Sequence, residues 1–334
     1  MPFMAGTRLG FVHPPLESFA SGGNVYNARL LEHAGQSGFP LVSLPWRGAA
    51  PGGNWKLLVW DSLLLDQLKR VADERIGLLL HYLPSMEPDL ESGRRSKVEA
   101  NEHRAVMRAD FAIATGKSVA NIVAARWPAK PVFVCEPGIS EVFLRSRPRH
   151  EERTVKLLTV AHLLPAKGHA RLLEALLALR HLQWHWHLAG DCNASSETTS
   201  LLRNRAALAG LTERITFHGA LPQEGVAALM AVSDVLVCAS TFEAYGMAVA
   251  EAVASGLPVL SNRVGTAEQL IRHGVTGFLT APGDRGSFGQ YLERLIEDDA
   301  LRATFRHNLL RDVVVRRWEQ TCADFRAVCD AMVR

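Results

Sequence analysis

The sequence predicts an α/β protein in which two domains each contain a parallel sheet. Short apolar runs alternate with helix-like stretches along the whole chain, which is typical of parallel α/β layers. The length of 334 residues suits two domains of about 150 residues each. A polar stretch at 145–153 separates two series of such elements and is typical of an interdomain linker.

Each half is expected to contribute six strands. The expected strands are Leu9–Val12, Leu41–Leu44, Leu57–Trp60, Ile76–His81, Phe111–Thr115 and Val132–Cys135, then Lys156–Ala161, Trp184–Ala189, Ile215–His218, Val235–Ala239, Val259–Ser261 and Gly277–Thr280. Expected helices include Tyr26–Ala34, His169–Leu182, Glu197–Ala209 and Gly225–Val232.

These elements predict a first domain over 1–144, a linker over 145–153 and a second domain over 154–312. The apolar spacing after Asn308 predicts a C-terminal helix, within 313–334, that packs back on the first domain. Because ligands of parallel sheets bind at the carboxyl ends of the strands, a cleft between the two domains is the expected site.

Composition narrows the functional class. Hydrophobic content of 48% and charged content of 21% are those of a soluble globular protein. The net charge of +3 demands no nucleic-acid partner, although a mildly basic first half leaves peripheral membrane contact or an anionic acceptor open. Five scattered cysteines and the lack of a long apolar segment predict a cytoplasmic protein.

Glu243 and Glu251 are the most informative pair of residues. A helix is expected to start near Tyr245-Gly246-Met247, so Glu251 lies about two turns into it, and eight residues of helix span about 12 Å. The unpaired N–H groups and partial positive charge of a helix N-terminus suit a phosphate. Two carboxylates for hydroxyls, with backbone amides between them, predict a nucleotide-sugar site.

Three further motifs follow expected strands. Gly22-Gly23 lies at a strand-to-helix turn, where glycine lets the backbone approach a phosphate. Lys167, beside a glycine, can neutralise a diphosphate. Gly190 and Gly219 end two more strands and can face a nucleotide base. Each motif also has a simpler explanation when it is considered alone. The glycine pair could form only a tight turn, the lysine could be an exposed structural residue, and the last two glycines could be ordinary strand ends.

The order of these pieces resembles that of the family-four glycosyltransferases, which have the GT-B fold. The segments 256–268 and 273–284, Gly-Leu-Pro-Val-Leu-Ser-Asn-Arg-Val-Gly-Thr-Ala-Glu and His-Gly-Val-Thr-Gly-Phe-Leu-Thr-Ala-Pro-Gly-Asp, are similar to the donor-domain signature of that family. The similarity is close over 154–285 and looser over 1–144. It implies transfer of a sugar from a nucleotide diphosphate donor with retention of anomeric configuration, with no cofactor and no bound metal.

The resemblance also implies roles for individual residues. Lys167 would contact the donor diphosphate and Glu251 the ribose hydroxyls. Glu243 would lie by the donor sugar. Tyr245 and the backbone amides of Gly246 and Met247 would also belong to the donor site.

Two histidines also belong to the expected site. His81 matches a histidine that faces the sugar from the first domain, although a histidine at a strand end is also explained as polar lining. His162 stands where the family usually has an arginine as second phosphate contact. Because histidine is charged only part of the time near neutral pH, donor affinity could be lower or pH-dependent.

The leading interpretation is a glycosyltransferase with Glu243, Lys167 and His81 as catalytic residues and a small, glycan or lipid-linked acceptor. The alternatives are a nucleotide-sugar epimerase on the same fold and a non-catalytic, glycosyltransferase-like interaction protein. A P-loop at Thr115–Ser118 is rejected because the first glycine of that motif is missing. His185 and His187 share a strand face, but a third metal ligand at suitable spacing is not evident.

Overall fold

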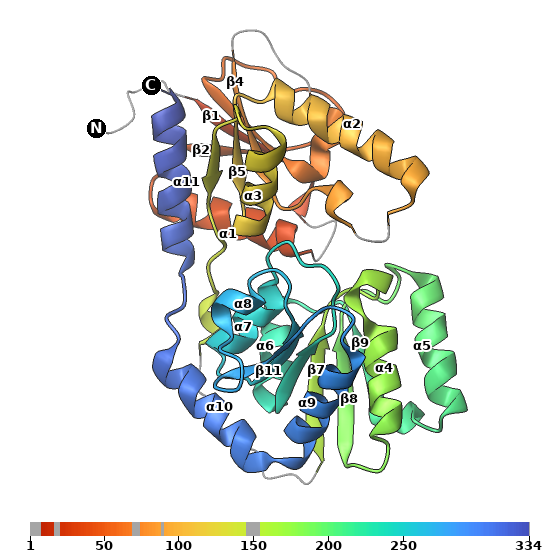
Figure 1. Ribbon diagram of the computed structural model, residues 1–334. Coiled ribbons are helices and arrows are strands. Elements are labelled where there is room, and N and C mark those ends of the chain that lie inside the picture. The colour runs from red at the N-terminus through yellow and green to blue at the C-terminus, as the bar shows by residue number, and fades with distance from the viewer. Residues whose placement is uncertain (1–7, 17–20, 69–73, 88–89, 145–153, 334) are drawn as a thin grey trace. The chain divides into compact units, whose positions relative to one another are not determined.

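The computed structural model describes residues 8–16, 21–68, 74–87, 90–144 and 154–333, and the predicted linker at 145–153 lies outside them. The chain forms two compact units (Figure 1). Unit 1 comprises Met1–Gly138 and Arg316–Arg334, and unit 2 comprises Ile139–Val315. Each unit contains a six-stranded sheet whose paired strands are all parallel, which confirms the predicted α/β fold class.

The sheet of unit 1 has the order β2-β1-β3-β4-β5-β6. Its strands are β1 Leu9–His13, β2 Leu41–Pro45, β3 Leu57–Asp61, β4 Arg75–Leu80, β5 Phe111–Ala114 and β6 Val132–Val134. Its α-helices are α1 Gly22–Gln36, α2 Ser92–Arg108, α3 Lys117–Arg126 and α11 Trp318–Val333, with short 3-10 helices η2 Ser62–Gln67 and η3 Pro84–Met86. Strands β1, β3 and β5 are buried at every position, as expected for parallel strands covered on both faces.

The sheet of unit 2 has the order β12-β11-β10-β7-β8-β9. Its strands are β7 Val155–Val160, β8 Trp184–Ala189, β9 Ile215–Gly219, β10 Val235–Cys238, β11 Val259–Asn262 and β12 Gly277–Thr280. Its α-helices are α4 His169–Ala178, α5 Ser196–Leu208, α6 Gln223–Val232, α7 Met247–Ala254, α8 Ala267–Leu270, α9 Arg285–Glu297 and α10 Asp299–Asp312. Short 3-10 helices are η4 Glu141–Phe143, η5 Pro165–Lys167 and η6 Thr212–Arg214.

Two apolar clusters fill unit 2. One joins α4, α5 and α9 to residues such as Trp184 and Trp186 of β8. The other joins α6 and α7 to residues such as Leu158 and Leu236. Because successive strand residues point to opposite faces, the alternation Trp-His-Trp-His in β8 puts both indoles in the first cluster.

The C-terminal helix α11 belongs to unit 1, where it packs against α1. The ring of Trp318 lies 5.5 Å from that of Tyr26, and Phe325 lies 6.3 Å from Phe11. The unit boundary falls at Gly138–Ile139, earlier than residue 144, because Phe143 is buried in the second cluster of unit 2 and its carbonyl accepts a hydrogen bond from Ser255.

Helix α1 begins four residues before its predicted start. Ser21 is its N-cap, and its hydroxyl accepts the backbone N–H of Asn24. Gly22 and Gly23 are therefore the first helical residues and not a turn that precedes the helix. The predicted start was too late because a serine cap, and not an apolar period, sets the start of this helix.

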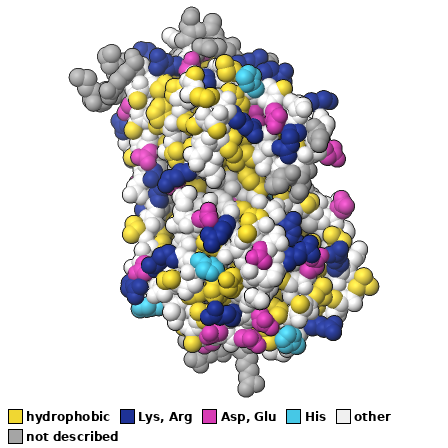
Figure 2. Space-filling model, viewed as in Figure 1, with side chains coloured by type: hydrophobic (Ala, Val, Ile, Leu, Met, Phe, Trp, Pro, Cys, Tyr) yellow, Lys and Arg dark blue, Asp and Glu magenta, His cyan; other side chains and the backbone are white. Residues whose placement is uncertain are grey.

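On the face shown in Figure 2, basic side chains lie among acidic ones and do not gather into one field. Among the described residues, no helix has both the length and the apolar character needed to cross a membrane.

Candidate functional site

The strand order of unit 2 reverses between β7 and β10. From β7 the chain moves outward through β8 and β9, and it then returns to the other side of β7 to form β10, β11 and β12. Loops that leave the carboxyl ends of neighbouring strands at such a reversal diverge and leave room for a ligand. Lys167 follows β7 and Glu243 follows β10, so the two predicted catalytic residues of this unit lie on the two sides of the reversal.

Lys167 and Glu243 form an ion pair. The Nζ atom of Lys167 lies 2.8 Å from Oε1 of Glu243, and the side chains are 22% and 16% exposed. The hydroxyl of Ser240 donates to the same Oε1 atom at 2.8 Å. Both side chains are therefore ordered and still reachable by a ligand.

Backbone packing fixes the positions of these two side chains. Gly168 has φ of +73°, and a Cβ atom there would lie 2.1 Å from the carbonyl oxygen of Ala239. The start of α4 thus packs directly on the end of β10, which only glycine permits. The side-chain amide of Asn262 donates to the carbonyls of Ala239 and Ser240 at 3.1 and 2.9 Å, which holds the loop that leads to Glu243.

Helix α7 begins at Met247, as predicted, and Gly246 is its N-cap with φ of +95°. The first N–H groups of a helix have no partner within the helix, so Gly246 and Met247 present donors next to Glu243 in the chain. The carbonyl of Tyr245 accepts the backbone N–H of Thr266 at 2.7 Å, which ties the residue before Gly246 to the loop after β11.

Glu251 lies in the second turn of α7 and is 7% exposed. Burial raises the pKa of its carboxyl group to about 8, while a hydrogen bond with the side chain of Gln223 acts in the opposite direction. The hydroxyl of Ser140 donates to Oε1 of Gln223 at 3.1 Å and so orients that amide. Burial therefore favours the protonated form of the Glu251 carboxyl group.

The remaining predicted donor residues lie at the ends of β7, β8 and β9. The N–H of Gly190 donates to the carbonyl of Gly219 at 2.8 Å, so the two predicted base-contact glycines are joined. Nδ1 of His162 accepts the backbone N–H of Asp191 at 3.1 Å. Because Nδ1 acts as the acceptor, the ring hydrogen of neutral His162 is on Nε2.

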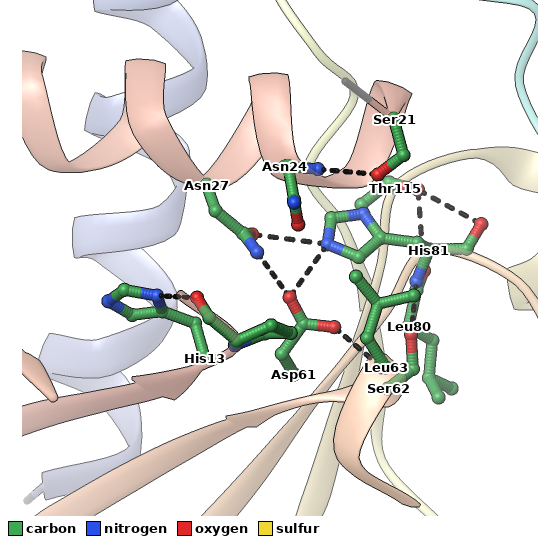
Figure 3. A network of polar contacts seen from close by, with 11 residues as sticks. His13, Ser21, Asn24, Asn27, Asp61, Ser62, Leu63, Leu80, His81 and Thr115 are labelled. Carbon is green, nitrogen blue, oxygen red and sulfur yellow. Dashed lines mark hydrogen bonds and ion pairs between the residues drawn. The ribbon is translucent and has the colours of Figure 1, made fainter. Parts of the chain in front are cut away.

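His81, a predicted residue of unit 1, lies in a second polar cluster, which Figure 3 shows. His81 follows β4 and is 8% exposed, and a Cβ atom on Gly23 would lie 3.1 Å from its Cδ2 atom. Gly22 and Gly23 therefore bring the first turn of α1 against the imidazole ring. Nε2 of His81 lies 3.2 Å from Oδ2 of Asp61 and 3.1 Å from Oδ1 of Asn27.

Four residues of these sites were not predicted from the sequence: Asp61, Asn27, Ser240 and Gln223. Asp61 and Ser240 could have been found, because each is a polar residue at or just beyond the carboxyl end of an apolar strand. Asn27 and Gln223 lie on helices with no such signal, and only the fold shows which side chains they meet.

A cavity of about 470 Å³ lies between α4 and α9, and the predicted site residues do not line it. Its walls combine apolar residues such as Leu179 and Phe288 with charged ones such as Arg171 and Arg285. Ala239 and Asn262 also line it, so it adjoins the loop that leads to Glu243.

The histidines of β8 form a stack with His218. Ring centroids of His185 and His187 lie 4.7 Å apart, and Nδ1 of His187 lies 3.0 Å from Nε2 of His218. Burial lowers the pKa of all three rings, that of His187 to about 4. Within the described part of the chain, no group of three or more histidine, cysteine, aspartate or glutamate side chains is arranged to hold a metal ion.

Each unit contains a Rossmann-like sheet of parallel strands, and in unit 2 polar residues lie at the strand-order reversal. This arrangement is that of the GT-B class of two-domain α/β proteins. The solved structures agree. Sucrose-phosphate synthase from Thermosynechococcus elongatus is 17% identical with a TM-score of 0.81, and the similarity covers 98% of this chain and 99% of that one. Anabaena HepE in complex with UDP and glucose is 18% identical with a TM-score of 0.75, over 97% of this chain and 100% of that one.

The family model described as glycosyl transferases group 1 matches residues 142–310, and the chain belongs to this family. It is similar to D-inositol 3-phosphate glycosyltransferase of Salinispora tropica, with 28% identity over 305 residues. That region covers 81% of this chain and 63% of the relative, so the chain spans somewhat less than two thirds of the length of that protein. N-acetyl-alpha-D-glucosaminyl L-malate synthase of Bacillus anthracis is 35% identical over 91 residues, 27% of this chain and 23% of that one.

Proposed function

We propose that the protein transfers a sugar from a nucleotide diphosphate donor to a small, glycan or lipid-linked acceptor, with retention of anomeric configuration. The observation that carries the proposal is the Lys167–Glu243 ion pair at the strand-order reversal of unit 2, directly before the N-terminus of α7. The similar HepE protein has been solved in complex with UDP and glucose and with UDP-glucose, which favours a uridine nucleotide as the first donor to test.

The charges in unit 2 suit the proposed reaction. Departure of the leaving group develops negative charge on the diphosphate and positive charge at the anomeric carbon. The Lys167 ammonium group and the first N–H groups of α7 would stabilise the negative charge without a metal ion. The Glu243 carboxylate would face the positive charge.

In the free protein Lys167 is already paired with Glu243, so a bound diphosphate would compete with this carboxylate for the ammonium group. The pair therefore keeps Lys167 ordered before the donor arrives, and the donor must offer a stronger charge to displace Glu243. A nucleotide diphosphate does so, whereas a nucleoside does not.

A thermal-shift screen of UDP, GDP, ADP and dTDP, with uridine as the uncharged control, tests the proposal. Binding stabilises a fold by RT ln(1 + [L]/Kd), so the melting temperature should rise for one or more diphosphates and not for uridine. Product analysis with the matching sugar donor then separates transfer to an acceptor from epimerisation of the donor alone. Failure of every diphosphate to bind would remove the basis of the proposal.

A further inference from the structure

The cavity of about 470 Å³ in unit 2 lies between α4 and α9, two helices that pack side by side (Figure 1). Its volume is within the range of about 300–1,000 Å³ that is typical of small-molecule sites. Because α4 follows β7 and α9 follows β12, both helices begin at the carboxyl edge of one parallel sheet. Ala239 and Asn262 line the end of the cavity at this edge, and Leu179 and Glu293 line the other end, about two helical turns away.

Small residues on both helices keep this space open. Helix α9 contributes Gly289 to the cavity wall, and α4 contributes Ala175 and Ala178. Gly289 lies inside a helix, where glycine is less favourable than alanine. No atom lies within 4 Å of its Cβ position and its φ is not positive, so neither packing nor backbone conformation requires glycine there. What this glycine does is leave room in the cavity.

Arg171, in the first turn of α4, gives the cavity a positive charge without a counter-charge. Among the described residues it forms no ion pair, and its Nη1 atom is buried without a hydrogen-bond partner. A buried donor that lacks a partner is unfavourable, and a bound acid would supply the missing acceptor. The other arginine of the cavity wall, Arg285, is paired with Glu174 at 3.1 Å. Of the two arginines, Arg171 is therefore the one available to a ligand.

The acidic residues near Arg171 favour a ligand with a single negative charge. Glu174 binds Arg205 with one carboxylate oxygen and Arg285 with the other. Asp284 is the N-cap of α9, and its carboxylate accepts the backbone N–H of Ser287 at 3.0 Å. Both carboxylates lie at the same end of the cavity as Arg171, so they would repel a doubly charged phosphate more strongly than a carboxylate.

We propose that this cavity binds a small monocarboxylic acid with an apolar body. Its carboxylate pairs with Arg171, and its body lies along the apolar wall that Leu179 and Phe288 form. Lys167 and Glu243 do not line the cavity, so the acid and a nucleotide can be bound at the same time. This inference goes beyond the proposed function and does not depend on it.

Gly289→Leu tests the site with a variant that should fold. Leucine is a better helix former than glycine, and its side chain would fill the cavity from a Cβ position that is open. Gly286→Leu is the matched control. Gly286 lies one turn earlier in α9 and does not line the cavity, and its Cβ position meets only the Asp284 carboxylate, at 3.7 Å.

A second pair of variants tests the charge. Arg171→Met removes the guanidinium group and keeps an apolar side chain of similar length. Arg180→Met is its control, because Arg180 is exposed and does not line the cavity.

Isothermal titration of the full chain with 3-phenylpropionate measures binding, and 3-phenylpropanamide is the uncharged probe. We expect the parent protein, Gly286→Leu and Arg180→Met to bind the acid with affinities within about twofold of one another. The amide should bind the parent at least about tenfold more weakly, and Arg171→Met should lose about tenfold in affinity for the acid, because a charge-assisted hydrogen bond is lost in each case. Gly289→Leu should not bind the acid, and saturation with UDP should change the affinity of the parent by less than about twofold.

The proposal is overturned if the parent binds the acid with a Kd above about 10 mM, or binds the acid and the amide equally. Equal affinities of Gly286→Leu and Gly289→Leu, or displacement of the acid by UDP, would also place the acid outside this cavity. If Gly289→Leu fails to fold, the comparison of Arg171→Met with Arg180→Met still decides. A parent protein that binds the acid but no nucleotide refutes the proposed function and leaves this inference standing.

Discussion

Glu251→Gln should make the protein more stable, and the gain should grow with pH. Burial raises the pKa of Glu251 to about 8 in the folded protein, against 4.5 for an ordinary glutamate. The folded state therefore holds the proton of Glu251 more tightly than the unfolded state does. The stability that this difference contributes is fully present below about pH 4.5 and is lost as the pH rises towards 8. Glutamine keeps the size of the side chain and cannot ionise, so the variant should not show this loss.

The size of the effect follows from the shift. One pKa unit corresponds to about 1.4 kcal/mol, so the free energy of unfolding of the parent protein should fall by about 3 kcal/mol between pH 5.5 and pH 8.0 through this one group. For a domain of the size of unit 2, a change of 1 kcal/mol in the free energy of unfolding changes Tm by about 2–4 °C. The Tm advantage of Glu251→Gln should thus be about 6–12 °C larger at pH 8.0 than at pH 5.5.

Differential scanning calorimetry of both proteins at the two pH values measures this difference. Glu213→Gln, which removes an exposed glutamate from the same unit, is the control, and its Tm difference from the parent should be the same at both pH values. If Glu251→Gln also shows the same difference at pH 5.5 and 8.0, the carboxyl group is not held in its neutral form by burial.

Three further results are expected. Glu243→Gln should lower the rate of sugar transfer at least about 100-fold, whereas UDP affinity should hold or rise because the Lys167 ammonium group loses its competing carboxylate. A coupled assay measures the transfer rate and isothermal titration measures the UDP affinity. Full activity of this variant would rule out a catalytic role for Glu243. Lys167→Met should weaken UDP binding about 10- to 100-fold, and the loss should shrink at high salt; an equal loss for uridine would contradict a diphosphate contact. Gly168→Ala should lower the free energy of unfolding by about 2 kcal/mol or more beyond the effect of Gly210→Ala. Gly210 is the matched control because its φ of +69° is also positive, whereas no atom lies within 4 Å of its Cβ position. Urea unfolding compares the two glycine variants, and equal losses would mean that the Ala239 contact is unimportant.

The strands could be predicted closely from the sequence because parallel strands buried on both faces are continuous apolar runs. Leu-Leu-Val-Trp at 57–60 and Ile-Gly-Leu-Leu-Leu at 76–80 lie in β3 and β4, with ends that differ from the prediction by a residue. Helix starts were less accurate where a side-chain cap and not an apolar period sets the boundary. Ser21 at the start of α1 is the clearest case.

The burial of Glu251 was also present in the sequence but was not used. In α7 this residue is surrounded by Met-Ala-Val-Ala on one side and Ala-Val-Ala on the other, so the helix is apolar all round. Such a helix is buried on every face, and a carboxyl group within it loses its hydration. By contrast, the hydrogen bond from Asp191 to His162 joins backbone and side chain across two strand ends, and no local pattern indicates it.

The close pairing of Lys167 with Glu243 depends on strand order, which the apolar pattern does not specify. The two residues are 76 positions apart and meet because β10 returns to lie beside β7. Unit 1 has the same kind of reversal, between β1 and β3: Gly23 follows one of these strands and Asp61 ends the other, and both adjoin His81. In each unit an ionisable side chain is thus oriented by partners from both sides of the reversal. A parallel sheet can therefore bring such a group and its partners together, because the segments that follow two neighbouring central strands start at the same edge of the sheet.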